Sequence, residues 1–357
     1  ALSATATTGN ITDSGALAIT GTTTLVTSAN DATIVLDTTT NAFTGALTIT
    51  TNDNSGTDAD VTIDGGTTAL VIAASTIDGD LTLRSGNASG IADSGTVTVG
   101  GNLSATTDAS NGVINMDTLA VDGTVALSPN GTGAVTIVND AGLNLAASTM
   151  GGTFSGTATT GDISDSGTLA ITGAATFITT AANRHIILDE SDSVFASTVT
   201  MQAGDGSNAA FGNITFVDSA AVRLHSSAAS AGDLYINAST DLAVGGNLNI
   251  TATTGNITQG AAVTVTGTSS FTTLATDADI TLSSANALGG AVTLTTAGSG
   301  GNATLDNGTT ALDIAASTVR GNLTLTSGNA SGITDSGLVT VGGNFSATTD
   351  ANNGDIN

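Results

Sequence analysis

The chain has 357 residues, of which 39% are hydrophobic but only 3% aromatic, and it contains 46 glycines, one proline and no cysteine. Its formal net charge is −26 with only four Lys and Arg residues, which excludes the basic surface that nucleic-acid binding needs. The lack of cysteine excludes a disulfide framework, and no apolar run is long enough for a membrane helix. We therefore expect no nucleic-acid partner and no membrane insertion.

The first hundred residues consist of short stretches in which apolar and polar residues alternate. The ranges 47–49, 81–83 and 97–99 each place a threonine between two aliphatic residues. A period of two is typical of a β-strand with one buried face. The Gly, Asn, Asp and Ser residues between these stretches favour turns, so the sequence predicts an all-β protein made of short strands.

An acidic stretch at residues 52–60 interrupts this pattern. Its alternating oxygen-bearing side chains suggest calcium, but it lacks the central glycine and the final acid of an EF-hand loop. We interpret it as a long acidic loop between strands. The acidic surface leaves weak calcium binding open, while the sequence predicts no dedicated metal and no cofactor.

Internal repetition is the dominant feature of the chain. Residues 79–115 match residues 321–357 at 30 of 37 positions without a gap. Dividing the chain at the glycine before each apolar triplet gives four kinds of repeat unit, found at 247–267, 268–290, 291–321 and 322–343. The same four kinds occur in the same order over about 2–101. The approximate sub-repeats are 2–101, 102–173, 174–246, 247–343 and a partial one at 344–357, with 102–246 a degenerate version.

Substitutions between the two copies indicate which side of each strand is buried. Leu70 stays leucine in the second copy, whereas its neighbour Val71 becomes Asp313. Charge therefore varies on one face alone. The change from Thr96 to Leu338 fits this rule only in part.

Repeat units this short cannot close a core of their own and must stack on their neighbours. We therefore predict a single continuous solenoid over 1–357: a right-handed parallel β-helix of about fifteen coils, each of roughly 20 to 30 residues. Turn Asn and Thr residues are expected to form polar ladders along it. A β-sandwich is disfavoured because no Trp exists for its core, and a β-propeller because no blade signature occurs.

His185 and His225 are the only histidines. A functional interpretation makes Arg184, His185 and Glu190 a site; the alternative, which we favour, is surface decoration in degenerate coils. Neither histidine has a second His or Cys at the spacing of a zinc site.

The recurring acids belong to Asp-Ser-Gly turns. These turns lie at Asp13, Asp93, Asp165 and Asp335, and recurrence indicates turn geometry, in which Asp accepts bonds from nearby backbone amides. A polysaccharide-active enzyme remains a minor alternative, but Tyr235 is the lone tyrosine for a sugar platform. We expect no enzyme and no catalytic residue. Rows of outward threonines, such as Thr48, Thr82 and Thr324, raise ice binding as a further minor alternative, although Thr is also simply a good strand former.

Three strings carry a family resemblance: residues 9–15 (Gly-Asn-Ile-Thr-Asp-Ser-Gly), 315–326 and 339–345. They resemble the repeat regions of filamentous haemagglutinin-like exoproteins, over nearly the whole chain. The resemblance implies a right-handed β-helix, secretion across a bacterial outer membrane, and adhesion or matrix building. The secretion domain of that family is absent from this sequence, and the coil lengths here are less regular.

These observations lead to an expected function as a segment of a large bacterial surface or filament-forming protein. We expect an extracellular or cell-surface stalk or fibre block that self-associates end to end or continues in a longer chain. The alternative is an adhesin whose interrupted coils, best placed at 184–232, bind a host or glycan receptor.

Overall fold

The computed structural model describes residues 1–52, 58–197, 199–204, 212–219, 222–224, 233–235, 242–244, 247–252, 255–260, 262–350 and 354–357. Over these residues the chain forms strands and no helix, and so no helix that could cross a membrane. It divides into two compact units, unit 1 (Ala1–Ala174) and unit 2 (Ala175–Asn357). The prediction of one continuous solenoid over 1–357 stays a prediction.

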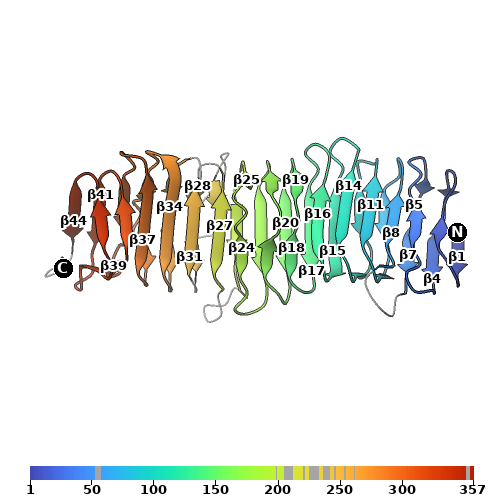
Figure 1. Ribbon diagram of the computed structural model, residues 1–357, viewed down its shortest axis with the longest axis horizontal. Helices are drawn as coiled ribbons and strands as arrows, with labels where there is room; N and C mark the ends of the chain where they lie inside the picture. The colour runs from blue at the N-terminus through green and yellow to red at the C-terminus, as the bar shows by residue number, and fades with distance from the viewer. Residues whose placement is uncertain are drawn as a thin grey trace. The chain divides into compact units, whose positions relative to one another are not determined.

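Unit 1 consists of short strands arranged in parallel sheets (Figure 1). One sheet contains β1 (Leu2–Ala6), β4 (Thr23–Thr27), β7 (Leu47–Thr50), β9 (Leu70–Ile72), β10 (Ser75–Ile77), β12 (Ile91–Asp93), β13 (Val97–Val99), β15 (Ile114–Val121), β17 (Val135–Asn139) and β20 (Phe154–Ala158). A second contains β2 (Ile11–Thr12), β5 (Ile34–Leu36), β8 (Val61–Asp64), β11 (Leu81–Ser85), β14 (Leu103–Thr107), β16 (Thr124–Ser128), β18 (Leu143–Leu145) and β21 (Ile163–Asp165). Shorter pairs are β3 (Ala18–Ile19) with β6 (Ala42–Phe43), and β19 (Ser148–Met150) with β22 (Leu169–Ile171).

Unit 2 is built in the same way. One of its sheets contains β23 (Ala175–Thr179), β26 (Val199–Gln202), β28 (Val222–Leu224), β29 (Asp233–Tyr235), β32 (Ile257–Gln259), β35 (Ile280–Leu282), β38 (Ala303–Asp306), β41 (Leu323–Ser327) and β44 (Phe345–Thr349). Another contains β24 (Ile186–Leu188), β27 (Ile214–Asp218), β31 (Leu248–Ala252), β34 (Ser269–Thr276), β37 (Val292–Ala297), β39 (Leu312–Ile314), β40 (Ser317–Val319), β42 (Ile333–Asp335) and β43 (Val339–Val341). The remaining strands are β25 (Val194–Phe195), β30 (Leu242–Val244), β33 (Val263–Val265) and β36 (Ala287–Leu288).

The strand pairs among the described residues are parallel, and most of them join strands of successive coils, as a solenoid requires. Leu81 of β11 pairs with Val61 of the coil before it and with Leu103 of the coil after it. The predicted parallel β-solenoid is therefore confirmed, with about 14 turns over the described residues where we expected about fifteen. Unit 2 also contains a coil with more residues than the others named here, since Ile214 of β27 pairs directly with Leu248 of β31.

One kind of repeat unit holds four strands, and this separates the sequence repeat from the coil. The unit of residues 46–79 contributes β7, β8, β9 and β10. As a result β11 stacks on β8 and not on β7, although β7 opens the preceding unit. In unit 2 the long unit 291–321 likewise contributes β37, β38, β39 and β40. A unit of this kind is thus more than one coil. As a result, the first strand of the following unit lies in the other sheet from the first strand of this one.

Among the residues whose burial is described, the core consists of inward residues of the strands. Val, Ile and Leu fill it as expected, and six of the eight phenylalanines are also buried there. Leu70 and Leu312, the equivalent residues of the two copies, are 0% and 1% exposed. The intervening Val71 and Asp313 are half-buried, so the substitution rule is confirmed at this strand. Thr96 and Leu338 are both exposed, so this exception is an apolar residue on the outer face.

Candidate functional site

The corners of the coils in unit 1 carry a ladder of side-chain hydrogen bonds. Asp60 Oδ1 accepts the backbone N–H of Asp80 at 2.8 Å, and Asp80 Oδ1 accepts that of Asn102 at 2.6 Å. Asn102 Oδ1 accepts both the N–H and the hydroxyl of Thr124, at 2.8 and 2.9 Å. Each oxygen satisfies an amide of the coil above, at the corner where sheet bonding is interrupted. We call these residues rungs.

Unit 2 has the same rungs. Asn256, Asp279, Asn302 and Asn322 each accept the amide of the next residue in the series, which ends at Asn344, at 2.7 to 2.8 Å. The polar ladders predicted from the turn residues are present in both units.

Glycine usually precedes a rung because the rung below occupies the space of a side chain. A Cβ added at Gly123 would lie 2.7 Å from Asn102 Oδ1, and one at Gly321 would lie 2.6 Å from Asn302 Oδ1. Contacts this short do not occur for real Cβ atoms without a shift of the neighbour. The recurring Gly-Asn and Gly-Asp pairs of the sequence are therefore a packing requirement of the ladder.

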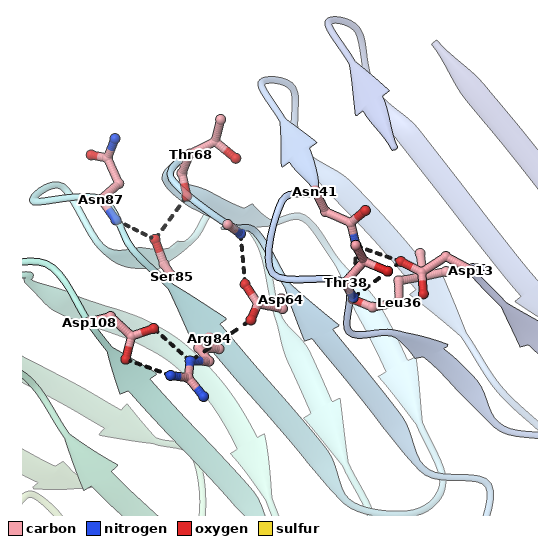
Figure 2. A network of polar contacts seen from close by, with 11 residues as sticks. Asp13, Leu36, Thr38, Asn41, Asp64, Thr68, Arg84, Ser85, Asn87 and Asp108 are labelled. Carbon is pink, nitrogen blue, oxygen red and sulfur yellow. Dashed lines mark hydrogen bonds and ion pairs between the residues drawn. The ribbon is translucent and has the colours of Figure 1, made fainter. Parts of the chain in front are cut away.

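The Asp-Ser-Gly turns also act between coils. Asp93 accepts the amides of Asp117 and Thr118 at 3.1 and 2.8 Å, and Asp13 accepts the side-chain amide of Asn41 at 2.7 Å (Figure 2). These bonds reach 24 to 28 residues along the chain and so join neighbouring coils, whereas the turn motif predicted bonds to nearby backbone amides.

Arg84 forms the ion pairs found in the described part of the chain. Figure 2 shows its guanidinium between Asp64 and Asp108. Arg84 Nε and Nη2 lie 2.6 and 3.0 Å from the two carboxylate oxygens of Asp108, and Nε lies 3.9 Å from Asp64 Oδ2. The hydrogen bond to Asp108 raises the pKa of Arg84. The sequence analysis did not identify this ion pair.

Asp64 is the buried member of this group. It is 6% exposed and accepts the amide of Gly66 at 2.7 Å. Desolvation raises the pKa of its carboxyl, although the Gly66 amide and Arg84 oppose the shift. Gly66 has a φ of +54°, a conformation that glycine adopts without strain.

The candidate cluster of Arg184, His185 and Glu190 lies at the beginning of unit 2. His185 Nδ1 accepts the amide of Asn213 at 2.8 Å, so the imidazole occupies a rung position. Asn213 Oδ1 in turn accepts the amide of Asn247 at 2.8 Å. Arg184 is exposed and Glu190 half-buried. His225 lies outside the described residues, as does much of the predicted binding region 184–232; the backbone of Tyr235 is described, in β29.

The acidic stretch 52–60 is described only at its ends. Asn52 donates to the carbonyl of Ser28, and Asp60 is a rung. Over the described residues no group of three or more His, Asp or Glu side chains is placed to hold a metal ion.

Threonines form rows on the outer faces. In unit 2 one row crosses successive coils in register and consists of Thr251, Thr272, Thr295, Thr318 and Thr340. None of these hydroxyls has a protein hydrogen-bond partner within the described residues. The row therefore presents uncharged hydroxyl and methyl groups at the strand spacing, about 4.8 Å.

Comparison with known proteins adds a family. No curated protein and no solved structure matches the chain. The family "Repeats of unknown function (DUF5649)" matches residues 1–50, 132–202, 211–295 and 300–357. This match covers more than half of the chain and agrees with the repeats and coils described above. The chain therefore belongs to the DUF5649 family of repeats.

Proposed function

We propose that the chain is an extracellular structural segment of a large bacterial surface or filament-forming protein, and that it acts as a rigid stalk or fibre block rather than as an enzyme. The observation that carries the proposal is the rung ladder. Its hydrogen bonds tie successive coils together at the corners, in addition to the parallel sheet bonds along the faces. A repeat of this kind extends by adding coils and needs no special residue at any one of them.

The surface supports the same function. The outer row from Thr251 to Thr340 carries no charge, and the Asp residues of the ladder lie at the corners. Charges stacked in register one strand apart would repel one another, and the uncharged threonine row avoids this repulsion on its own face. The resemblance of the strings at 9–15, 315–326 and 339–345 to filamentous haemagglutinin-like repeats favours a bacterial surface location.

Electron microscopy of the native material tests this proposal. Rods or continuous fibres of constant width are the expected result, because stacked coils elongate in one direction. Continuous fibres favour end-to-end assembly or a longer chain, and isolated surface rods favour the adhesin alternative. Compact particles would contradict a stalk or fibre role.

The threonine row favours one second candidate, ice binding. A neutral row of free hydroxyl groups on a regular sheet is suited to ordered water. Thermal hysteresis of the purified chain is the readout, with Thr272→Lys and Thr295→Lys as variants that place charge in the row. A freezing point that the chain does not depress would exclude this candidate and leave the structural proposal unaffected.

A further inference from the structure

One rung of unit 2 is a histidine. Nδ1 of His185 accepts the backbone N–H of Asn213 at 2.8 Å. His185 directly precedes β24 and Asn213 directly precedes β27, and these two strands pair in register from Ile186 and Ile214 onward. Beside the rung, the N–H of Ile186 donates to the carbonyl of Asn213 at 3.0 Å. One side-chain bond and one backbone bond therefore join the two coils at this corner.

The other rungs accept with oxygen. Asp80, Asn102 and Asn302 each accept through Oδ1. An amide oxygen accepts a hydrogen bond in acid as well as at neutral pH, and a carboxyl group keeps an acceptor oxygen when it is protonated. An imidazole nitrogen accepts only while it carries no proton, and in the charged histidine both ring nitrogens are donors. Among the described residues, His185 is thus the rung whose acceptor disappears on protonation.

Charged residues also lie on the elements before and after His185. In chain order they are Asp162, which precedes β21 in unit 1, then Arg184, Asp189 and Glu190, and Asp218 at the end of β27. β23, which contacts β24, carries no charged residue. Carboxyl groups in water titrate at about pH 4 and arginine stays charged, whereas histidine is the side chain that changes its charge between about pH 5 and 8.

The coil that begins at this rung is long. Asn213 Oδ1 accepts the amide of Asn247, which lies 34 residues further along the chain. The rungs at Asp60 and Asp80 in unit 1 reach only 20 and 22 residues. A longer segment costs more conformational entropy to close. The histidine rung is therefore placed where the anchoring of a coil has most entropy to offset.

We propose that His185 is an acid-sensitive rung, and that protonation of its imidazole releases the amide of Asn213 and loosens the corner at which this long coil begins. A proton on Nδ1 would point at the N–H of Asn213, so that two donors would face each other across the present 2.8 Å. The imidazolium turns away, and the amide loses its acceptor. The ladder of unit 2 is then continuous at neutral pH and interrupted at His185 in acid.

Amide hydrogen exchange in the full 357-residue chain tests this proposal. The measured quantity is the protection factor of the Asn213 amide, which is its exchange rate in an unfolded peptide divided by its rate in the protein at the same pH. The reference is the amide of Thr124, which is held by Asn102 Oδ1 at 2.8 Å. The variant His185→Asn places a common rung residue at the corner and leaves His225 unchanged.

In the wild type we expect the protection factor of Asn213 to fall about tenfold from pH 8 to pH 5, as the loss of one hydrogen bond implies, while that of Thr124 stays constant. A scalar coupling between the backbone nitrogen of Asn213 and Nδ1 of His185 should be present at the higher pH and absent at the lower one. In His185→Asn the protection of Asn213 should persist in acid. Protection of Asn213 that is independent of pH in the wild type, or that falls equally at Thr124 or in His185→Asn, would overturn the proposal.

Discussion

The two copies at residues 66–115 and 308–357 carry nearly the same sequence in different surroundings. Leu103 of the first copy lies between Leu81 and Val125 and is 1% exposed. Its equivalent Phe345 pairs with Leu323, has no strand on its other side among the described residues, and is 56% exposed. In a solenoid, the strand that stacks on a residue decides its burial as much as the residue's own side chain does.

From this comparison we expect the largest change in the free energy of unfolding for substitutions in the core. Leu103→Ala is expected to lower the free energy of unfolding by about 2–5 kcal/mol, because it removes a side chain enclosed on both sides. Phe345→Ala removes a larger side chain but is expected to cost less, since over half of it is in solvent. Urea denaturation of both variants measures the difference, and equal losses would show that stacking does not govern burial here.

A smaller effect is expected at the rungs. Asn102→Ala removes the acceptor of the Thr124 amide and hydroxyl, at a cost of about 1 kcal/mol. Asn344 is the matched control: its amide is bonded to Asn322, as that of Asn102 is to Asp80, but its side chain accepts no hydrogen bond within the described residues. Asn344→Ala should change stability by less than about 0.5 kcal/mol. A loss at Asn344 as large as that at Asn102 would argue against the ladder.

The ion pair of the first copy should matter little to stability. Arg84 is half-exposed and Asp108 likewise, and exposed pairs contribute about 0–1 kcal/mol. We expect Arg84→Thr, which copies the second repeat, to shift the melting temperature only slightly at low salt and not at all at high salt. A large loss at both salt concentrations would mean that Arg84 packs as well as pairs.

The smallest expected effect is on pH dependence. Burial raises the pKa of Asp64 above its ordinary value of 3.8, so the folded state holds the proton more tightly than the unfolded state. The resulting stabilisation is present below pH 3.8 and is lost as the pH rises through the raised folded value. Asp64→Asn should remove this decline from the stability curve, and Arg84→Thr should enlarge it, because Arg84 favours the charged carboxyl. Curves that coincide for wild type and Asp64→Asn would contradict the shift.

Much of the architecture could be predicted from the sequence, because strand periodicity and repetition are local signals. The alternation at 81–83 predicted the buried Leu81 and Leu83, and Leu70 was identified as inward by comparing the copies. The sheet to which each repeat belongs could not be predicted in this way. Stacking is decided by the number of strands in the preceding unit, and the four-strand unit 291–321 looked like one long coil.

The contacts of the candidate site residues could not be predicted from the sequence either. His185 was singled out as a rare residue, but its rung role depends on Asn213, which lies 28 residues away and one coil later. The bonds of Asp93 to the next coil were likewise hidden, since a turn motif by itself suggests bonds within the turn. Contacts between coils follow from the stacking register, and the sequence pattern alone does not specify that register.

The most direct test of the account is a pair of cysteine cross-links across β11, in a chain that has no cysteine of its own. Thr62 pairs in register with Thr82, whereas Thr48 opens the preceding repeat unit and lies in the other sheet. Cα atoms one strand apart, about 4.8 Å, are within reach of a disulfide. We expect Thr62→Cys with Thr82→Cys to form a disulfide readily and Thr48→Cys with Thr82→Cys to stay reduced. A disulfide in the second variant, or none in the first, would contradict the stacking on which the whole account rests.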